Sequence, residues 1–163
     1  TRYPYVTGVQ TCALPISVGV GEGTKGNFFY TGSQTAHLNH GHVGMYYLKD
    51  KIVESVPKEG VRRITTKSRK VDKGDAMVKS VTTSSTKRAN AANWANSRVG
   101  LDKYSFNFAT NRKTEHTGDK NCSKLIWSAY KLKANLDLDN DKGLGVYPRD
   151  VRDAKDTKLV RKI

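Results

Sequence analysis

The chain has 163 residues, of which 36% are hydrophobic and 27% are charged, and this length is enough to bury the core of one soluble domain. No apolar run approaches the roughly 18 to 20 residues that cross a bilayer, and the first residues lack the pattern of a signal peptide. Lysine and arginine outnumber acidic residues 29 to 15, and the resulting net charge of +14 favours a polyanionic partner such as nucleic acid, anionic lipid or a phosphate-rich cell wall.

The first seventeen residues do not resemble a folded segment, because they show neither a helical nor a strand period. The stretch "VTGVQTCALPI" (6–16) back-translates in one reading frame into text that resembles the end of a widely used sequencing adapter. We therefore interpret residues 1–17 as adapter-derived and residues 18–163 as a single domain, with any natural export signal lying upstream. On this interpretation Cys12 drops out, and Cys122 is a lone thiol without an internal disulfide partner.

The first half of the chain is predicted to form antiparallel strands. Five short segments are rich in aromatic and β-branched residues and are separated by Gly, Pro, Lys and Asp. These segments are residues 26–32, 42–48, 51–56, 60–66 and 74–81.

The second half is predicted to be mainly helical. Residues 84–100 have alanines at helical spacing, with Ser84 or Ser85 as the cap and Gly100 as the stop. A second helix begins near Cys122, and residues 148–154 and 157–163 add a short helix and a final strand. The predicted class is α+β, with an antiparallel sheet or small barrel packed against helices.

Cys122 is predicted to lie on the first turn of its helix, facing inward. Unpaired backbone N–H groups and the helix dipole stabilise a thiolate at that position, which favours a nucleophile. The alternative is a small buried hydrophobic residue, which is the role of most lone cysteines.

A nucleophilic thiol needs a histidine, and the chain has four. His42 opens a strand, and Gly44 leaves space on the same face for a substrate or another backbone. His37 and His40 lie in a loop, and His116 lies in a polar loop where we expect it to be solvated.

Glu54 on the next strand is the first candidate to orient the imidazole of His42. A hairpin centred on Leu48 sets Glu54 across from His42, whereas a two-residue turn at 49–50 sets it across from Met45. The sequence leaves the register open. It also leaves open that Glu54 is an exposed strand carboxylate, although its apolar neighbours favour burial.

The motifs "GNFFYTG", "GHVGMYY", "IVES", "YSFN", "NCSKLIWSAY" and "VYPRDV" occur in the order found in one enzyme family. Over residues 25–152 the chain resembles the circularly permuted papain-like cysteine hydrolases of the NlpC superfamily, the YiiX-like and YycO-like group. The resemblance implies that Cys122 is the nucleophile, His42 the base and Glu54 the third member. It also implies that Tyr104 lines the substrate site, at the oxyanion position.

The resemblance further implies acyl transfer through a thioester on amide or ester bonds, without a cofactor. The expected activity is that of a cell-wall peptide amidase or peptidase acting on peptidoglycan stem peptides. A lipid-directed acyl hydrolase or transferase of the same fold is the alternative. We expect a monomer that is secreted or associated with an anionic cell wall, and a cytosolic enzyme at a lipid surface would suit the same charge.

The segment "DLDNDKG" places Asp137, Asp139 and Asp141 at the alternate spacing of a calcium loop. Its glycine comes one position late, and the twelfth position is Pro148 instead of a glutamate, which excludes an EF-hand. A looser calcium site and a solvated acidic turn both remain open.

A non-enzymatic binding module is the rival from another class. Residues 58–74 would then form a basic contact strip for cell-wall polymer or nucleic acid. Few aromatic residues are interleaved with these charges, and no zinc, RRM or KH pattern is present, so we expect no nucleic-acid ligand.

Overall fold

The computed structural model describes residues 13–33 and 40–163. The strands are β1 (Ser17–Gly19), β2 (Phe28–Thr31), β3 (His42–Leu48), β4 (Lys51–Val56), β5 (Gly60–Thr65), β6 (Lys70–Asp72), β7 (Ala76–Val81) and β8 (Thr157–Lys162). The helices are α1 (Ser85–Ser97), the 3-10 helix η1 (Asn111–Thr114), α2 (Cys122–Ala134) and α3 (Pro148–Asp153). Among these described helices, none combines the length and the apolar content needed to cross a membrane.

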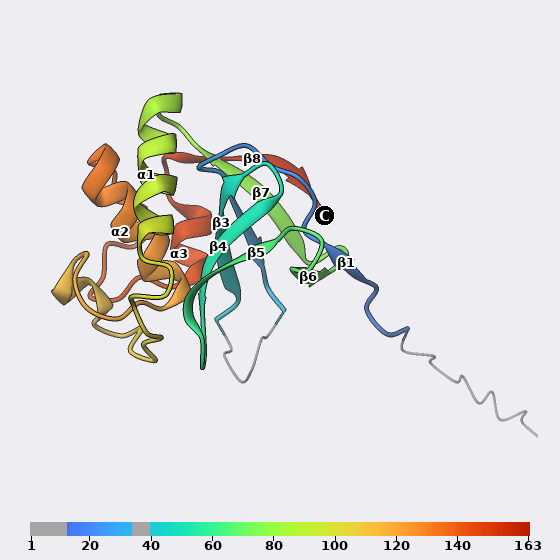
Figure 1. Cartoon of the computed structure of the whole chain (residues 1–163), viewed down its shortest axis with the longest axis horizontal. Coiled ribbons are helices and arrows are strands. Elements are labelled where there is room, and N and C mark those ends of the chain that lie inside the picture. Colours follow the sequence, from blue (N-terminus) through green and yellow to red (C-terminus); the bar gives the residue numbers. More distant parts are fainter. Residues whose placement is uncertain (1–12, 34–39) are drawn as a thin grey trace, which may run out of the picture.

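Within the described residues, six strands form one antiparallel sheet in the order β5-β4-β3-β2-β7-β8, which confirms the predicted α+β class. The sheet is open, with β5 and β8 at its edges. Figure 1 shows α1, α2 and α3 on one side of the sheet, with the separate β1-β6 pair beyond its other side. The sequence did not predict β1 and β6, because each strand has only three residues.

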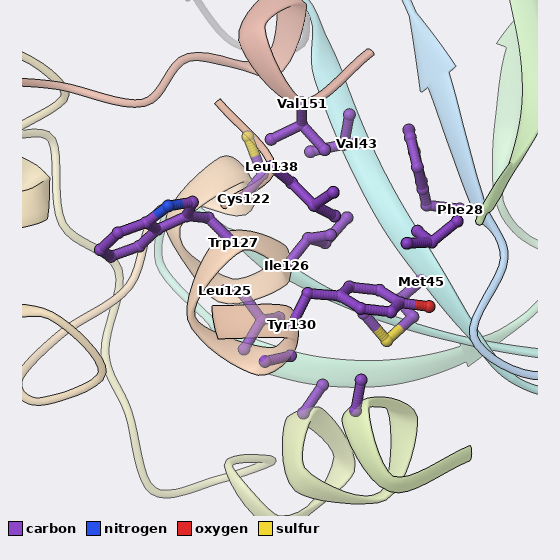
Figure 2. Packing of buried hydrophobic residues seen from close by; sticks show 14 of the residues in the cluster. Phe28, Val43, Met45, Cys122, Leu125, Ile126, Trp127, Tyr130, Leu138 and Val151 are labelled. Atoms are coloured by element: carbon purple, nitrogen blue, oxygen red, sulfur yellow. The ribbon is translucent and has the colours of Figure 1, made fainter. Parts of the chain in front are cut away.

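The side chains of β2 point alternately to the two faces of the sheet, and each face has its own hydrophobic core. Phe28 and Tyr30 pack in the main cluster with the helices, whereas Phe29 packs in a second cluster with Val71 of β6. Cys122 belongs to the main cluster, and Figure 2 shows it at the end of α2 where Leu138 and Val151 also lie. The helix-facing core therefore reaches the start of α2.

Helix α2 is fixed at both of its ends. Asn121 caps it by accepting a hydrogen bond from the backbone N–H of Lys124 at 3.0 Å, and Asn135 ends it in the left-handed conformation. The hydroxyl of Tyr130 donates to the carbonyl of Gly26 at 2.5 Å, which ties the helix to the residues before β2. The predicted helix at 84–100 is observed as α1, and Ser84 is its cap.

The proposed adapter-derived segment lies largely outside the described residues, as does Cys12. At its end, the carbonyl of Ile16 accepts a hydrogen bond from the N–H of Lys73 at 2.8 Å, and Ser17 pairs with Asp72 in the β1-β6 ladder. Regular pairing with the rest of the chain thus begins at these two residues within the described part.

Candidate active site

The helix α2 begins at Cys122, as predicted, and a network of asparagines holds its first turn. Asn121 accepts a hydrogen bond from the side chain of Asn111 at 3.2 Å and donates to the carbonyl of Asn107 at 3.0 Å. Cys122 itself is 1% exposed. A substrate carbonyl can therefore reach the sulfur only when the side chains that cover it move.

His42, the first residue of β3, lies against Glu54 of β4. The distance from His42 Nε2 to Glu54 Oε2 is 2.6 Å, and the two residues are 5% and 0% exposed. Because Nε2 is occupied by Glu54, Nδ1 is the nitrogen that remains for Cys122. Glu54 is therefore fully buried, and the alternative of an exposed strand carboxylate is wrong.

The two-residue turn at 49–50 is observed, but Glu54 does not stand opposite Met45 as that turn alone would place it. Lys51 pairs with Leu48 across the tight turn, but a bulge between Tyr46 and Leu48 shifts the ladder, so Met45 faces Val53 instead of Glu54. Glu54 consequently reaches His42 diagonally across the two strands, a distance that long side chains can span.

Two arginines hold the other sides of the Glu54 carboxylate. Arg62 donates from Nε and Nη2 to Oε1 at 3.0 and 2.7 Å, and Arg69 Nε forms an ion pair with Oε2 at 2.9 Å. Burial acts to raise the pKa of Glu54, but His42, Arg69 and Arg62 lower it to about 2. Glu54 is therefore ionised at every physiological pH.

Sequence reasoning missed both arginines. Arg62 stands directly opposite Glu54 in the β4-β5 ladder, so the hairpin register could have revealed it. Arg69 follows the turn after β5, and no local sequence pattern predicts its contact with Glu54.

The pKa of His42 links it to Cys122. Burial acts to lower this pKa, but interactions with Cys122 and with Glu54 raise it to about 9. The structure thus brings together Cys122, His42 and Glu54.

The other histidines are differently placed. His40 packs its ring against Phe108 and Tyr147 at centroid distances of 5.2 and 5.0 Å. His116 lines a hollow together with Trp127. His37 lies outside the described residues.

Gly44 does not leave space beside His42. A Cβ atom added there would lie 2.5 Å from Cε1 of Phe29 and 3.0 Å from Cγ2 of Ile52. Our expectation of an open approach on that face was wrong, because the aromatic ring of β2 occupies it.

Tyr104 lies near Cys122. Burial and the charge of Cys122 raise the pKa of the Tyr104 phenol above its ordinary range. Its hydroxyl oxygen is buried and finds no hydrogen-bond partner among the described residues. A buried hydroxyl without a partner is costly, so this group is available to a ligand.

The three aspartates of the calcium-loop pattern do not gather at one point. Asp137 accepts hydrogen bonds from Arg112 at 2.9 Å and from Trp127 Nε1 at 2.8 Å. The carboxylates that do approach one another are Asp139, Asp141 and Asp150. The predicted set is corrected accordingly, with Asp150 of α3 in place of Asp137.

Known proteins are similar to this chain in sequence and in fold. Residues 27–159 match a family described as permuted papain-like amidase enzymes, YaeF/YiiX, C92 family. The chain is 55% identical over 139 residues to the uncharacterized protein YycO of Bacillus subtilis (strain 168), which corresponds to 85% of this chain and 56% of that protein. The chain therefore spans about half the length of the curated relative that it matches.

The fold is similar to the crystal structure of metalloprotein yiiX from Escherichia coli O157:H7. The TM-score is 0.65 at 18% sequence identity, and the match covers 87% of this chain and 98% of that chain.

Proposed function

This chain belongs to the family of permuted papain-like amidases, and from that premise we propose that it is a cysteine hydrolase with Cys122 as nucleophile, His42 as acid and base, and Glu54 as the orienting carboxylate. The proposal is supported by the buried pair of His42 and Glu54, with 2.6 Å between Nε2 and Oε2, and by the interaction with Cys122 that helps to raise the pKa of His42. Nucleophile, base and orienter are the three parts that thiol catalysis requires.

The charges of the site support an imidazolium at His42 at neutral pH. With its pKa raised to about 9, His42 is protonated at pH 7, and the ionised Glu54 stabilises that proton. The start of α2 adds backbone N–H groups that have no partner within the helix and favour negative charge on Cys122. The nucleophile is thus prepared before a substrate arrives.

The reaction then proceeds in two stages. The Cys122 thiolate attacks the carbonyl carbon, a C–S bond forms, and the oxyanion collapses as the leaving amine takes the proton of His42. Neutral His42 next removes a proton from water, which attacks the thioester and releases the acid and the Cys122 thiolate. The backbone N–H of Cys122 and the unpaired Tyr104 hydroxyl would hold the oxyanion.

We further propose that the substrate is an amide bond of a peptidoglycan stem peptide, and that the protein is secreted or wall-associated. The net charge of +14 supports retention by anionic wall polymers.

A lipid acyl substrate is the second candidate, and the apolar surface near Tyr104 favours it. Phe106, which packs on the Tyr104 ring at a centroid distance of 4.9 Å, is 68% exposed. An exposed aromatic side chain beside Tyr104 is suited to a lipid surface.

Substrate panels compared between wild type and Cys122→Ala test the proposal. Muropeptides and phospholipid vesicles are incubated separately with each protein, and the released amine or fatty acid is measured. We expect release from one panel by the wild type and a loss of at least about a thousandfold in Cys122→Ala, because the nucleophile cannot be replaced. Equal release by the two proteins would refute the cysteine-hydrolase assignment.

A further inference from the structure

Three carboxylates meet beside the start of α3, outside the active site. Asp139, Asp141 and Asp150 each offer one oxygen, and these oxygens lie within 4.8 Å of one another. Asp139 is 3% exposed, and its Oδ1 is buried without a hydrogen-bond partner among the described residues. A buried carboxylate oxygen without a partner is costly and indicates a ligand.

Each of the three aspartates is anchored through one oxygen. Another residue of the same protein donates a hydrogen bond to that oxygen, so the carboxylate has a defined orientation. The anchors are Arg112 Nη1 on Asp139 Oδ2 at 2.5 Å, the Gly143 N–H on Asp141 Oδ1 at 2.8 Å, and the Tyr147 N–H on Asp150 Oδ2 at 2.8 Å. The cluster is therefore oriented before any ligand binds.

Positive charge near the cluster is shared with a further carboxylate. Arg112, which holds Asp139, also donates to both oxygens of Asp137, at 2.9 and 3.0 Å. Arg149 lines the adjacent hollow with Asp141 and Asp150. The charge of Arg112 is therefore divided between Asp139 and Asp137.

We propose that Asp139, Asp141 and Asp150 bind a hard divalent cation, Ca²⁺. The ligand set consists of carboxylate oxygens alone, which suit Ca²⁺ and do not select Zn²⁺ or Cu²⁺. His40 lines the adjacent hollow with Asp141 and Asp150 but does not belong to the cluster. The site stands on its own and does not rest on the hydrolase activity.

The cation would stabilise the segment that follows α2. Val146 in this segment exchanges hydrogen bonds with Asn111, donating at 2.8 Å and accepting at 2.9 Å, and also accepts from Ser123 Oγ at 2.8 Å. Asn111 in turn donates to Asn121, the cap of α2. Cation binding at α3 is therefore linked through one chain of hydrogen bonds to the turn that carries Cys122.

Calorimetric titration of the chelator-treated protein with CaCl2 tests the site, and thermal denaturation provides a second readout. We expect one saturable site with a Kd of about 10⁻⁴ to 10⁻³ M, the range of weak extracellular calcium modules. The melting temperature should rise with Ca²⁺ concentration, since a ligand that binds only the folded state stabilises it.

Asp141→Asn is the test variant, because Asp141 is exposed and its loss should leave the fold intact. It should weaken Ca²⁺ binding at least about fivefold, since one charged ligand is lost. Asp153→Asn removes a nearby charge from α3 outside the cluster and should change the Kd by less than about twofold.

Two results would overturn the site. No saturable heat for the folded wild type up to about 10 mM Ca²⁺ would mean that the arginines already neutralise the cluster. Equal Ca²⁺ affinity of Asp141→Asn and wild type would mean that the cation binds elsewhere.

Discussion

Glu54 shows how much of this site depends on the charge of a single residue. It has no exposed surface, yet His42, Arg62 and Arg69 keep its pKa at about 2. The charge serves His42 in return, because Glu54 is one of the two groups that raise the imidazole pKa to about 9. In the proposed mechanism, Glu54 therefore acts electrostatically on His42 as well as orienting it.

Replacement of Glu54 by Gln should therefore change the pH dependence of hydrolysis. In the wild type, kcat/KM falls as the pH rises through about 9, where His42 loses its proton. Without the carboxylate charge, the pKa of His42 drops and this alkaline limb moves to lower pH. The measurement is kcat/KM between about pH 6 and 10 on whichever substrate Cys122→Ala abolishes.

His116→Gln is the matched control, because His116 lies in the hollow beside Trp127. This substitution should not change the pH at which kcat/KM falls. An alkaline limb of Glu54→Gln that coincides with the wild type would contradict the coupling of Glu54 to His42.

The substitution Tyr104→Phe can distinguish an oxyanion-binding role of the Tyr104 hydroxyl from a role in stability. Its hydroxyl has no hydrogen-bond partner among the described residues, so Tyr104→Phe should leave the free energy of unfolding unchanged or higher. A lost oxyanion donor should nevertheless lower kcat about 10- to 1000-fold with little change in KM. Urea denaturation and steady-state kinetics on the same variant measure the two effects.

Tyr47→Phe removes a hydroxyl from a half-buried tyrosine elsewhere on β3 and should leave kcat unchanged. If Tyr104→Phe retains full kcat, the hydroxyl does not contact the oxyanion.

At the scale of the element, β3 is packed too tightly behind His42 to accept a larger residue. An added Cβ at Gly44 would lie 2.5 Å from the Phe29 ring and 3.0 Å from Ile52. Gly44→Ala should therefore lower the free energy of unfolding by about 1 to 3 kcal/mol, the usual cost of overpacking. Urea denaturation measures it.

Phe29→Leu in the same background should recover part of that loss, because the shorter side chain vacates the contact. Additive effects of the two substitutions would show that the strain lies elsewhere.

Periodicity predicted the elements well but not their fine alignment. Apart from β1, β6 and η1, the strands and helices follow from alternation, caps and glycine stops, and Cys122 at the start of α2 follows from its place before an apolar stripe. The bulge between Tyr46 and Leu48 did not follow, because it is decided by packing on both faces of the sheet. The place of Asp150 in the carboxylate cluster could not be predicted either, because it depends on how α3 packs against the rest of the chain.

At the scale of the whole molecule, the basic charge is not all available to a partner. The basic residues at 58–74 suggested a contact surface for a polyanion. However, Arg62 and Arg69 of this segment form ion pairs with Glu54. Lys120, 1% exposed, likewise pairs with Asp102 at 3.1 Å. The number of basic residues therefore overstates the cations available at the surface, whereas the net charge changes little, because Glu54 and Asp102 are buried with these cations.

The buried charges also determine how the whole fold responds to acid. The pKa of Glu54 is lowered from 4.5 to about 2, so its stabilisation is complete above about pH 4.5 and is lost as the pH falls toward 2. Arg62, Arg69 and His42 stay positive across this window, and protonation of Glu54 removes the carboxylate charge that the three groups share. The wild type should be more stable than Glu54→Gln at about pH 5.5, and the difference should narrow by at most about 1.4 kcal/mol per pH unit toward pH 2.5. Urea denaturation across that range measures it, and Glu22→Gln, which changes an exposed carboxylate, should follow the wild type. A stability difference between wild type and Glu54→Gln that stays constant with pH would mean that folding does not lower the pKa of Glu54.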